Sequence, residues 1–178
     1  RRHLVQVRSG TLCVIRAALR QQGYRVGGGS AERFLQRLDR LALPPALVAV
    51  LAPLRATVEA VTAAIAAAEA PLLTAAQADP VVQRLQTVPG VGPIVALTFR
   101  ASVDTVDRFA RAGQLSAALG LVPREDSSAE RRQRGHITKA GPSEVRSLLV
   151  QAAWACWRSG HSGTLRAWVA QLAARRGK

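Results

Sequence analysis

Two adjacent serines, Ser127 and Ser128, stand in a polar stretch that runs from residue 124 to residue 141. A serine hydroxyl is a weak nucleophile, so attack on phosphorus needs a base for its proton and positive groups for the developing charge. Arginine and lysine side chains bind phosphate oxygens well and would supply that charge. The residues that could hold a phosphodiester near Ser128 are Arg124, Arg131, Arg132, Arg134, His136, Thr138, Lys139 and, from the next helix, Arg146.

The same residues also have plainer interpretations. A pair of serines in a polar loop is far more often ordinary loop than a nucleophile. A histidine such as His136 could serve as a general acid or base, but in such a loop it more often contacts phosphate or solvent. The residue types alone therefore permit serine chemistry without selecting it.

A possible phosphate-binding turn lies upstream, where Val88-Pro89-Gly90-Val91-Gly92-Pro93 joins two apolar segments. The turn resembles the helix-hairpin-helix pattern. Gly90 and Gly92 permit positive φ and let a phosphate come close, and the amides after them begin a helix, where the dipole favours an anion. Such a module holds DNA or RNA without reading sequence. The alternative is an ordinary tight turn between helices.

Arginine dominates the charge of the chain. There are 25 Lys and Arg against 11 Asp and Glu, which gives a net charge of +14, and only Lys139 and Lys178 are lysines. A field of this sign favours polyanionic partners. A GC-rich genome would also raise the arginine content, but it would not explain the clustering of basic residues in the polar stretch.

The remaining sequence predicts an all-α fold, because helical spacing and strong helix formers dominate. We expect one helix over residues 1–22 that ends at Gly23, a second from an N-cap at Ser30 to about Leu41, and a third that starts at Pro44-Pro45. Further on, Ser143 should cap a helix. That helix should bury Val145, Leu148, Leu149, Ala152 and Cys156 on one face. The helical spacing of Trp154, Trp157 and Trp168 favours core or interface packing over stacking on bases.

An apolar seam follows the third helix start, with spacings that alternate between four and three residues. Pro53 should kink or restart this helix and Pro71 should end it. The spacing is typical of a coiled coil, either within the chain as a helical hairpin or between chains as a dimerisation seam. The seam residues are Leu47, Leu51, Leu54, Val58, Val61, Ile65, Ala68 and Leu72.

Two regions are expected, a helical and coiled-coil region over residues 1–78 and a second region over residues 79–178 that begins at Asp79-Pro80. Cys13 and Cys156 are in no metal-ligand spacing, which argues against a zinc site or a disulfide framework and suits a reducing cytoplasm. We expect no membrane span and no signal peptide, because the longest apolar stretches are interrupted by Pro, Arg or Glu. The first residue, Arg1, suggests a fragment or a processed chain.

The run from Val88 to about Trp157 resembles the C-terminal transposase domain of the IS one-ten and IS eleven-eleven family of insertion-sequence transposases. Two positions depart from the family pattern: Ala129 replaces the Gly after the family serine, and Pro142 replaces an Asn. The segments that carry the resemblance are residues 88–93, Phe109, Leu115, residues 118–123, Ser127-Ser128, Arg131-Arg132, residues 135–141 and residues 145–154.

The resemblance implies a serine, here Ser128, that attacks DNA and forms a covalent link. It also implies a separate RuvC-like domain with acidic ligands for Mg, absent from this chain, a structured guide RNA, and homo-oligomers. We therefore expect a transposase fragment that binds DNA, works in the bacterial cytoplasm at the nucleoid, and needs the RuvC-like domain to cut. The alternatives are a non-catalytic helix-hairpin-helix binding module, or a helical scaffold without affinity for nucleic acid.

Overall fold

The computed structural model describes residues 1–125, 128, 133–159 and 163–176. Contacts between residues divide the chain into two compact units, Arg1–Pro71 and Leu72–Lys178. The first is called unit 1 and the second unit 2. The sequence placed a boundary near residue 78, whereas the contacts divide the chain seven residues earlier, inside a long helix. Each unit is described by itself.

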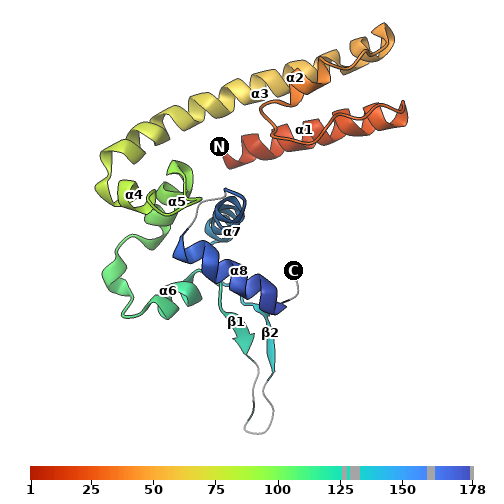
Figure 1. Cartoon of the computed structure of the whole chain (residues 1–178). Helices are drawn as coiled ribbons and strands as arrows, with labels where there is room; N and C mark the ends of the chain where they lie inside the picture. The colour runs from red at the N-terminus through yellow and green to blue at the C-terminus, as the bar shows by residue number, and fades with distance from the viewer. Residues whose placement is uncertain (126–127, 129–132, 160–162, 177–178) are drawn as a thin grey trace. The chain divides into compact units, whose positions relative to one another are not determined.

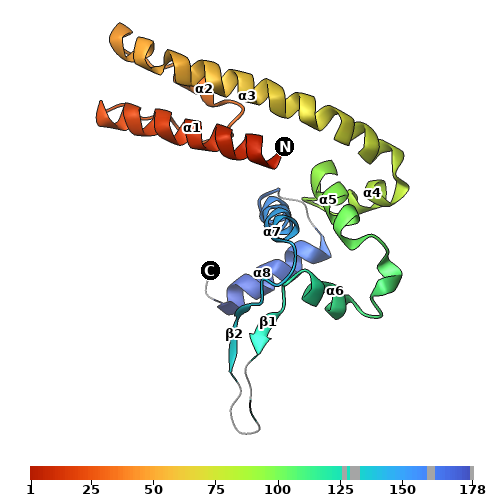
Figure 2. The ribbon, with the colours of Figure 1, turned by 180° about the vertical axis from the view of Figure 1, so that it is seen from behind.

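Unit 1 is built from α1 (Arg2–Gln21), the short α2 (Phe34–Leu38) and the first part of α3 (Pro45–Ala78). Helices α1 and α3 run side by side in opposite directions, and α2 lies against them (Figure 1, Figure 2). The expected end of the first helix at Gly23 and the expected start of the third at Pro44-Pro45 are confirmed. Gly23 has a φ of +79°, a conformation that glycine adopts without strain at a helix C-terminus.

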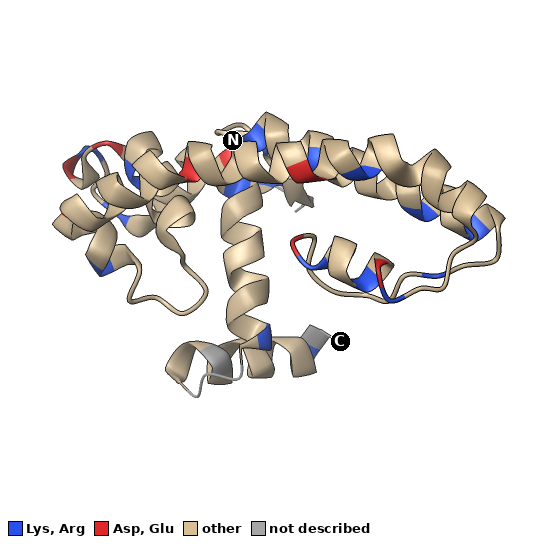
Figure 3. Cartoon of the chain, turned by 90° about the horizontal axis from the view of Figure 1, so that it is seen from above, with Lys and Arg blue, Asp and Glu red and all other residues tan. Residues whose placement is uncertain are grey.

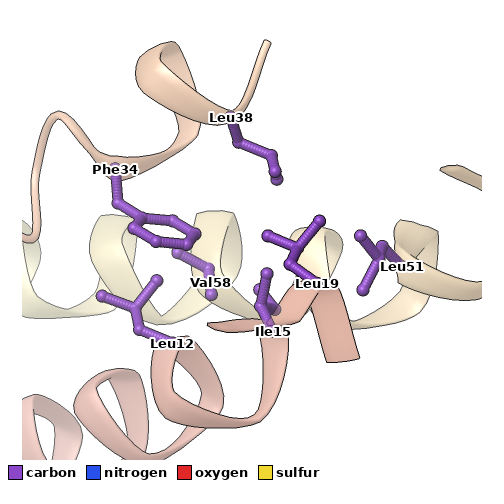
Figure 4. Packing of buried hydrophobic residues seen from close by; sticks show 7 residues of the cluster. All are labelled: Leu12, Ile15, Leu19, Phe34, Leu38, Leu51 and Val58. Carbon is purple, nitrogen blue, oxygen red and sulfur yellow. The ribbon is translucent and has the colours of Figure 1, made fainter. Parts of the chain in front are cut away.

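The core of unit 1 joins the three helices (Figure 4). Each fully buried aliphatic or aromatic side chain contributes about 1.5–3 kcal/mol, so this cluster stabilises the unit more than any of its ion pairs. Two of the buried seam residues belong to it, which means that the apolar seam of α3 packs within the chain. The buried members are Leu12, Ile15 and Leu19 of α1, Phe34 and Leu38 of α2, and Leu51 and Val58 of α3.

Two sequence expectations for unit 1 are wrong. Ser30 does not cap the second helix, because α2 begins at Phe34 with Arg33 as its N-cap. Pro71 does not end the third helix, which continues to Ala78. A proline removes one helical hydrogen bond, but Ala76 in the last turns is buried against Val82 and Ala96, and this packing offsets the loss.

The four acidic residues of residues 1–71, a segment that the structure describes completely, are all ion-paired. Figure 3 marks the positions of Asp and Glu in red and of Lys and Arg in blue. Arg1 pairs with Glu69 and Arg8 with Glu32, while Arg55 holds both Asp39 and Glu59. Arg8 is buried and lies 2.8 Å from the Glu32 carboxylate. Arg1, Arg8 and Arg55 therefore form ion pairs with every carboxylate of this unit.

Helix α3 is also long and apolar enough to cross a membrane, judged by length and composition alone. The sequence predicts no such segment. A single helix of this kind is weak evidence of a membrane span, and 17% of its apolar window is buried in the chain. Leu51, Val58 and Ile65 are among its buried residues, and Arg55 is bonded to Asp39.

Unit 2 is mostly helical around a small core of Ala76, Val82 and Ala96, which confirms the all-α class. Helix α5 packs on both α4 and α7. The Asp79 carboxylate caps α4 by accepting hydrogen bonds from the amides of Val81 and Val82. The elements are α4 (Pro80–Leu85), α5 (Pro93–Val103), the 3-10 turn η1 (Val106–Arg108), α6 (Ala112–Ala118), β1 (Pro123–Glu125), β2 (Arg134–Ile137), α7 (Ser143–Arg158) and α8 (Thr164–Arg176).

The two strands are the element that the sequence missed, because the polar stretch was expected to be irregular. They pair antiparallel, with Pro123 opposite Ile137 and Glu125 opposite Arg134, and a bulge between these pairs. The expected cap of α7 is also wrong: Ser143 is its first residue, and the N-cap is Pro142, which has no side chain to accept a hydrogen bond. The expected buried face of α7 is confirmed for Val145, Ala152 and Cys156, whereas Leu148 and Leu149 are only partly buried.

Candidate nucleic-acid interface

The strands of unit 2 are held at their base by two glycines. A Cβ on Gly120 would lie 2.6 Å from the Ala140 amide nitrogen, and a Cβ on Gly141 would collide with the carbonyl oxygen of Ala118. Both backbones therefore need the absence of a side chain. We call this contact of Gly120 with residues 139–141, and of Gly141 with residues 118–119, the glycine clasp.

Main-chain hydrogen bonds extend the pairing of the strands to the glycine clasp. The Thr138 amide donates to the Val122 carbonyl at 2.9 Å, and the Lys139 amide donates to the Gly120 carbonyl at 3.1 Å. Thr138 and Lys139 are both exposed. Lys139 has a φ of +56°, which is strained for a residue with a side chain. The sequence-predicted pair Thr138 and Lys139 is thus fixed in position at the base of the strands.

Arg146 of α7 pins the glycine clasp from the helix side. Its Nη1 donates to the carbonyl oxygens of Leu119, at 3.1 Å, and Gly141. A charge-assisted hydrogen bond contributes about 1.5–3 kcal/mol. The sequence predicts that Arg146 binds phosphate. In the structure its guanidinium group also holds the two carbonyl groups of the glycine clasp.

Ser128 is exposed and lies in the connection between β1 and β2. The strands that carry this connection extend away from the helices of unit 2 in both views (Figure 1, Figure 2). Arg124 on β1 and His136 on β2 are exposed as well. Arg124 and His136 therefore lie on the paired strands, while Ser128 lies in their connection and Lys139 lies at their base.

Three further predicted contacts cannot be placed in the same way. Arg131 and Arg132 lie outside the described residues. Arg134 is part of β2 and opposes Glu125, but its side chain is outside the described set.

The predicted phosphate-binding turn joins α4 to α5, and its two glycines differ. Gly90 has a φ of +88°, and a Cβ there would collide with the Ala152 carbonyl oxygen of α7. Its absent side chain thus makes room for a helix, not for a phosphate. Gly92 has a φ of −90°, so it does not adopt the positive φ that glycine permits, and a Cβ would meet open space.

Gly92 is the N-cap of α5, and Pro93 follows it at the first helical position. The first hydrogen bond of the helix runs from the Ala96 amide to the Gly92 carbonyl. The amides of Ile94 and Val95 therefore have no partner within the helix, as at any helix N-terminus. Of the two glycines, Gly92 stands at the end where an anion could approach.

The three tryptophans are not core residues. Trp154, Trp157 and Trp168 are 48%, 36% and 55% exposed, so the core alternative of the sequence analysis is wrong and only the interface alternative is left for a packing role. Trp154 and Trp157 line an apolar groove between α7 and α8 with Val150 and Leu172.

Among the residues that the structure describes, no group of three or more His, Cys, Asp or Glu side chains could hold a metal ion. Cys13 and Cys156 are free, the first exposed and the second buried.

Comparison with known proteins decides the family. The family model described as "Transposase IS116/IS110/IS902 family" matches residues 82–168. The "Transposase for insertion sequence element IS1111A" of Coxiella burnetii is 35% identical over 185 residues, which cover 99% of this chain and 50% of that protein. The chain belongs to the IS110 and IS1111 family of transposases.

Two further relatives agree with this assignment. The "Putative transposase y4qE" of Sinorhizobium fredii is 49% identical over 74 residues, or 42% of this chain and 19% of the relative. The "Probable family 20 transposase" of Pseudomonas aeruginosa is 34% identical over 116 residues, or 65% of this chain and 34% of the relative. The chain thus spans at most about half the length of these three transposases.

The segment matched by the transposase family model contains every site residue that the sequence predicted. It also contains the glycine clasp and its pin, Arg146, which the sequence reasoning did not find as a unit. Gly120 and Gly141 each stand in a motif that carries the family resemblance. Gly120 lies against residues 139–141 and Gly141 lies against residues 118–119. Neither the spacing of these glycines nor the composition of the chain predicts that contact.

Proposed function

We propose that this chain is the DNA-binding and strand-transferring part of an insertion-sequence transposase, with Ser128 as the nucleophile. The observation that carries the proposal is the exposure of Ser128 in the connection between two strands whose base is fixed by the glycine clasp and Arg146. A reactive hydroxyl must reach the phosphorus from a defined position, and a fixed base gives the strands that carry this connection such a position.

In the proposed reaction, the Ser128 Oγ bonds to the phosphorus of one DNA strand. The bond from phosphorus to one sugar oxygen breaks, and that oxygen leaves as a hydroxyl after taking up a proton, while the serine loses its own. The product is a new phosphodiester that joins protein and DNA, so the bond can later be passed to another strand without an outside energy source.

The basic residues around the strand pair would bind the phosphates beside the scissile one. Lys139 and Arg124 are exposed on the described part of the element. Arg131, Arg132 and Arg134 belong to the same proposal through the sequence alone. His136 on β2 is exposed and suits a phosphate contact or a proton transfer.

The turn before α5 would add a contact to the DNA backbone that does not depend on base sequence. The amides of Ile94 and Val95 and the open approach at Gly92 support this role. If Ser128 had no role, the same features would still favour the alternative function, a non-catalytic nucleic-acid-binding module.

The partners of the whole transposase are part of the proposal. From the family resemblance we propose a structured guide RNA, a homo-oligomer formed through the coiled coil, and a RuvC-like domain that holds Mg. We also propose that the protein works in the bacterial cytoplasm on nucleoid DNA. Leu72, the last seam residue, is 38% exposed and is available for such a contact.

The test is to trap the covalent link in the full-length transposase. DNA from the ends of its element would carry a bridging sulfur in place of the leaving oxygen, so that the departing thiol attacks poorly and the adduct accumulates on a denaturing gel. We expect Ser128→Ala to form no adduct and Ser127→Ala to form it normally. An adduct of undiminished yield with Ser128→Ala would refute the assignment, and DNA binding without any adduct in the unaltered protein would favour the non-catalytic module.

A further inference from the structure

A basic cleft lies in unit 1, outside the segment that the transposase family model matches. It has a volume of about 680 Å³ and is formed by the C-terminal end of α1 and the chain that follows it. Three arginines line it, Arg16, Arg20 and Arg25, together with Tyr24 and the backbone of Gly27-Gly28. No acidic side chain lines this cleft, all of whose residues the structure describes.

The cleft arginines have no carboxylate to neutralise them. All four acidic residues of residues 1–71, a fully described segment, are held by Arg1, Arg8 and Arg55, none of which lines the cleft. Arg20 and Arg25 are exposed, and Arg16 lies over the ring of Phe34 at 4.8 Å. Three like charges gathered without counter-ions repel one another, and an anion bound between them would relieve that repulsion.

Capping of α1 does not account for these arginines. Basic side chains near a helix C-terminus often bond the last carbonyl groups. Here the backbone does so: the Gly23 amide donates to the Arg20 carbonyl at 3.0 Å, and the Tyr24 amide donates to the Leu19 carbonyl at 2.9 Å. The guanidinium groups of Arg20 and Arg25 are therefore not needed to cap these carbonyl groups of α1.

The wall and floor of the cleft suit an extended polyanion. Tyr24 and Val26, which form one wall of the cleft, pack against the core of unit 1, and this packing holds them in position. A Cβ at Gly27 or Gly28 would meet nothing within 4 Å, so the backbone there is open to close approach by a phosphate. Arginine forks bind phosphate oxygens through two parallel hydrogen bonds.

We propose that this cleft is a second nucleic-acid-binding site, which takes the phosphodiester backbone of RNA or DNA through Arg16, Arg20 and Arg25. The inference rests on the proposed function, because it gives the transposase another contact to nucleic acid. The cleft belongs to unit 1, whereas the proposed Ser128 site belongs to unit 2. Phosphate is the shared chemistry, and the two nucleic acids are separated by the choice of probe.

The test measures how binding by the full chain depends on salt, with a labelled DNA duplex and a labelled single-stranded RNA. The cleft variant is Arg20→Gln with Arg25→Gln, which leaves the Arg16–Phe34 contact in place. Each lost phosphate contact lowers the slope of log affinity against log salt by about 0.9 for duplex DNA and about 0.7 for a single strand. We expect a loss of about 1.8 with DNA or about 1.4 with RNA, and the probe that shows it identifies the ligand.

The matched control is Arg33→Gln with Arg40→Gln, which removes the same charge from exposed positions of unit 1 that do not line the cleft. Equal slopes for the cleft variant and this control, with both probes, would overturn the second site and indicate a diffuse charge effect. Lys139→Ala in the same assay reports on unit 2. A lower slope for Lys139→Ala alone would keep the proposed function and overturn the cleft, whereas salt-independent binding by the unaltered chain would overturn both.

Discussion

Gly120 and Gly141 lie against each other at the base of the strand pair that carries Ser128. A Cβ on Gly120 would come 2.9 Å from the Gly141 amide nitrogen, and a Cβ on Gly141 would come 2.7 Å from the Leu119 carbonyl carbon. Because the neighbours in both cases are backbone atoms, they cannot turn aside as a side chain would. The position of the strands relative to α6 and α7 therefore depends on two missing side chains.

Gly141→Ala should destabilise unit 2 by about 1–3 kcal/mol or more, because the new methyl group collides with the Ala118 carbonyl oxygen. All three tryptophans lie in α7 and α8, so their fluorescence during denaturant unfolding reports on this unit. The control is Gly113→Ala in α6, where a Cβ meets nothing within 4 Å and helix propensity predicts a gain of about 0.5–1 kcal/mol. Equal midpoints for the two variants would contradict the glycine clasp.

Gly90→Ala and Gly92→Ala should separate packing from phosphate binding in the turn before α5. Alanine at position 90 combines a positive φ with a clash against α7, so we expect a loss of about 1–3 kcal/mol in stability. Alanine at position 92 has an ordinary φ and open space, so we expect only a smaller loss of about 0.5–1 kcal/mol, because alanine is a poorer N-cap than glycine.

The same pair is then compared for binding to a DNA duplex. Gly92→Ala should weaken binding although it costs less stability than Gly90→Ala, because its methyl group obstructs approach to the amides of Ile94 and Val95. Binding that is unaltered in Gly92→Ala would remove the turn from the proposed interface.

Local signals in the sequence predicted those parts of the fold that neighbouring residues determine. The end of α1 at Gly23 and the start of α3 at Pro45 follow from the backbone preferences of glycine and proline. The buried face of α7 follows from the periodicity of Val145, Ala152 and Cys156. In each case the residues that determine the helix end or the buried face are close together in the sequence.

Features that depend on distant residues were not predictable in this way. Helix α3 passes Pro71 because Ala76 packs against Val82 and Ala96, an effect that no local propensity contains. The strand pair was hidden because polar, charged residues have little strand propensity, and its pairing is fixed by the glycine clasp. Ser128 itself came from the family resemblance, since residue type alone does not distinguish it from an ordinary loop serine.

Lys139 combines a strained backbone with a charge at the proposed site, and two substitutions separate these properties. Lys139→Gly relieves the positive φ and Lys139→Ala does not, so the glycine variant should be the more stable by about 1 kcal/mol. Both remove the same ammonium group. If Lys139 contacts phosphate, both should lower the salt slope for duplex DNA by about 0.9.

Stability and DNA binding are therefore both measured for Lys139→Gly and Lys139→Ala. Tryptophan fluorescence during unfolding gives the stability, and the fluorescence anisotropy of a labelled duplex gives the binding. Salt slopes equal to that of the unaltered chain would exclude Lys139 as a contact, and equal stabilities would show that its backbone conformation carries no strain.

The Arg8–Glu32 pair should make the stability of unit 1 depend on acid. The pKa of Glu32 lies below its ordinary value of 4.5, chiefly through a backbone hydrogen bond, with further lowering by Arg8 and Ser30 and opposition from burial. A carboxyl group with a lowered pKa stabilises the fold above its unfolded pKa, and that contribution disappears as the pH falls through the folded value.

Glu32→Gln should therefore cost about 0.5–1 kcal/mol at neutral pH, because it removes the counter-ion of the buried Arg8 but the Glu32 side chain is itself 60% exposed and screened by water. The difference from the unaltered chain should shrink as the pH falls below 4.5. Hydrogen exchange of the α1 amides measures it, because α1 carries Arg8. Glu59→Gln, which removes an exposed i,i+4 partner of Arg55, is the control and should cost no more than about 0.5 kcal/mol. A Glu32→Gln penalty that persisted unchanged at acid pH would show that the carboxylate charge is not its source.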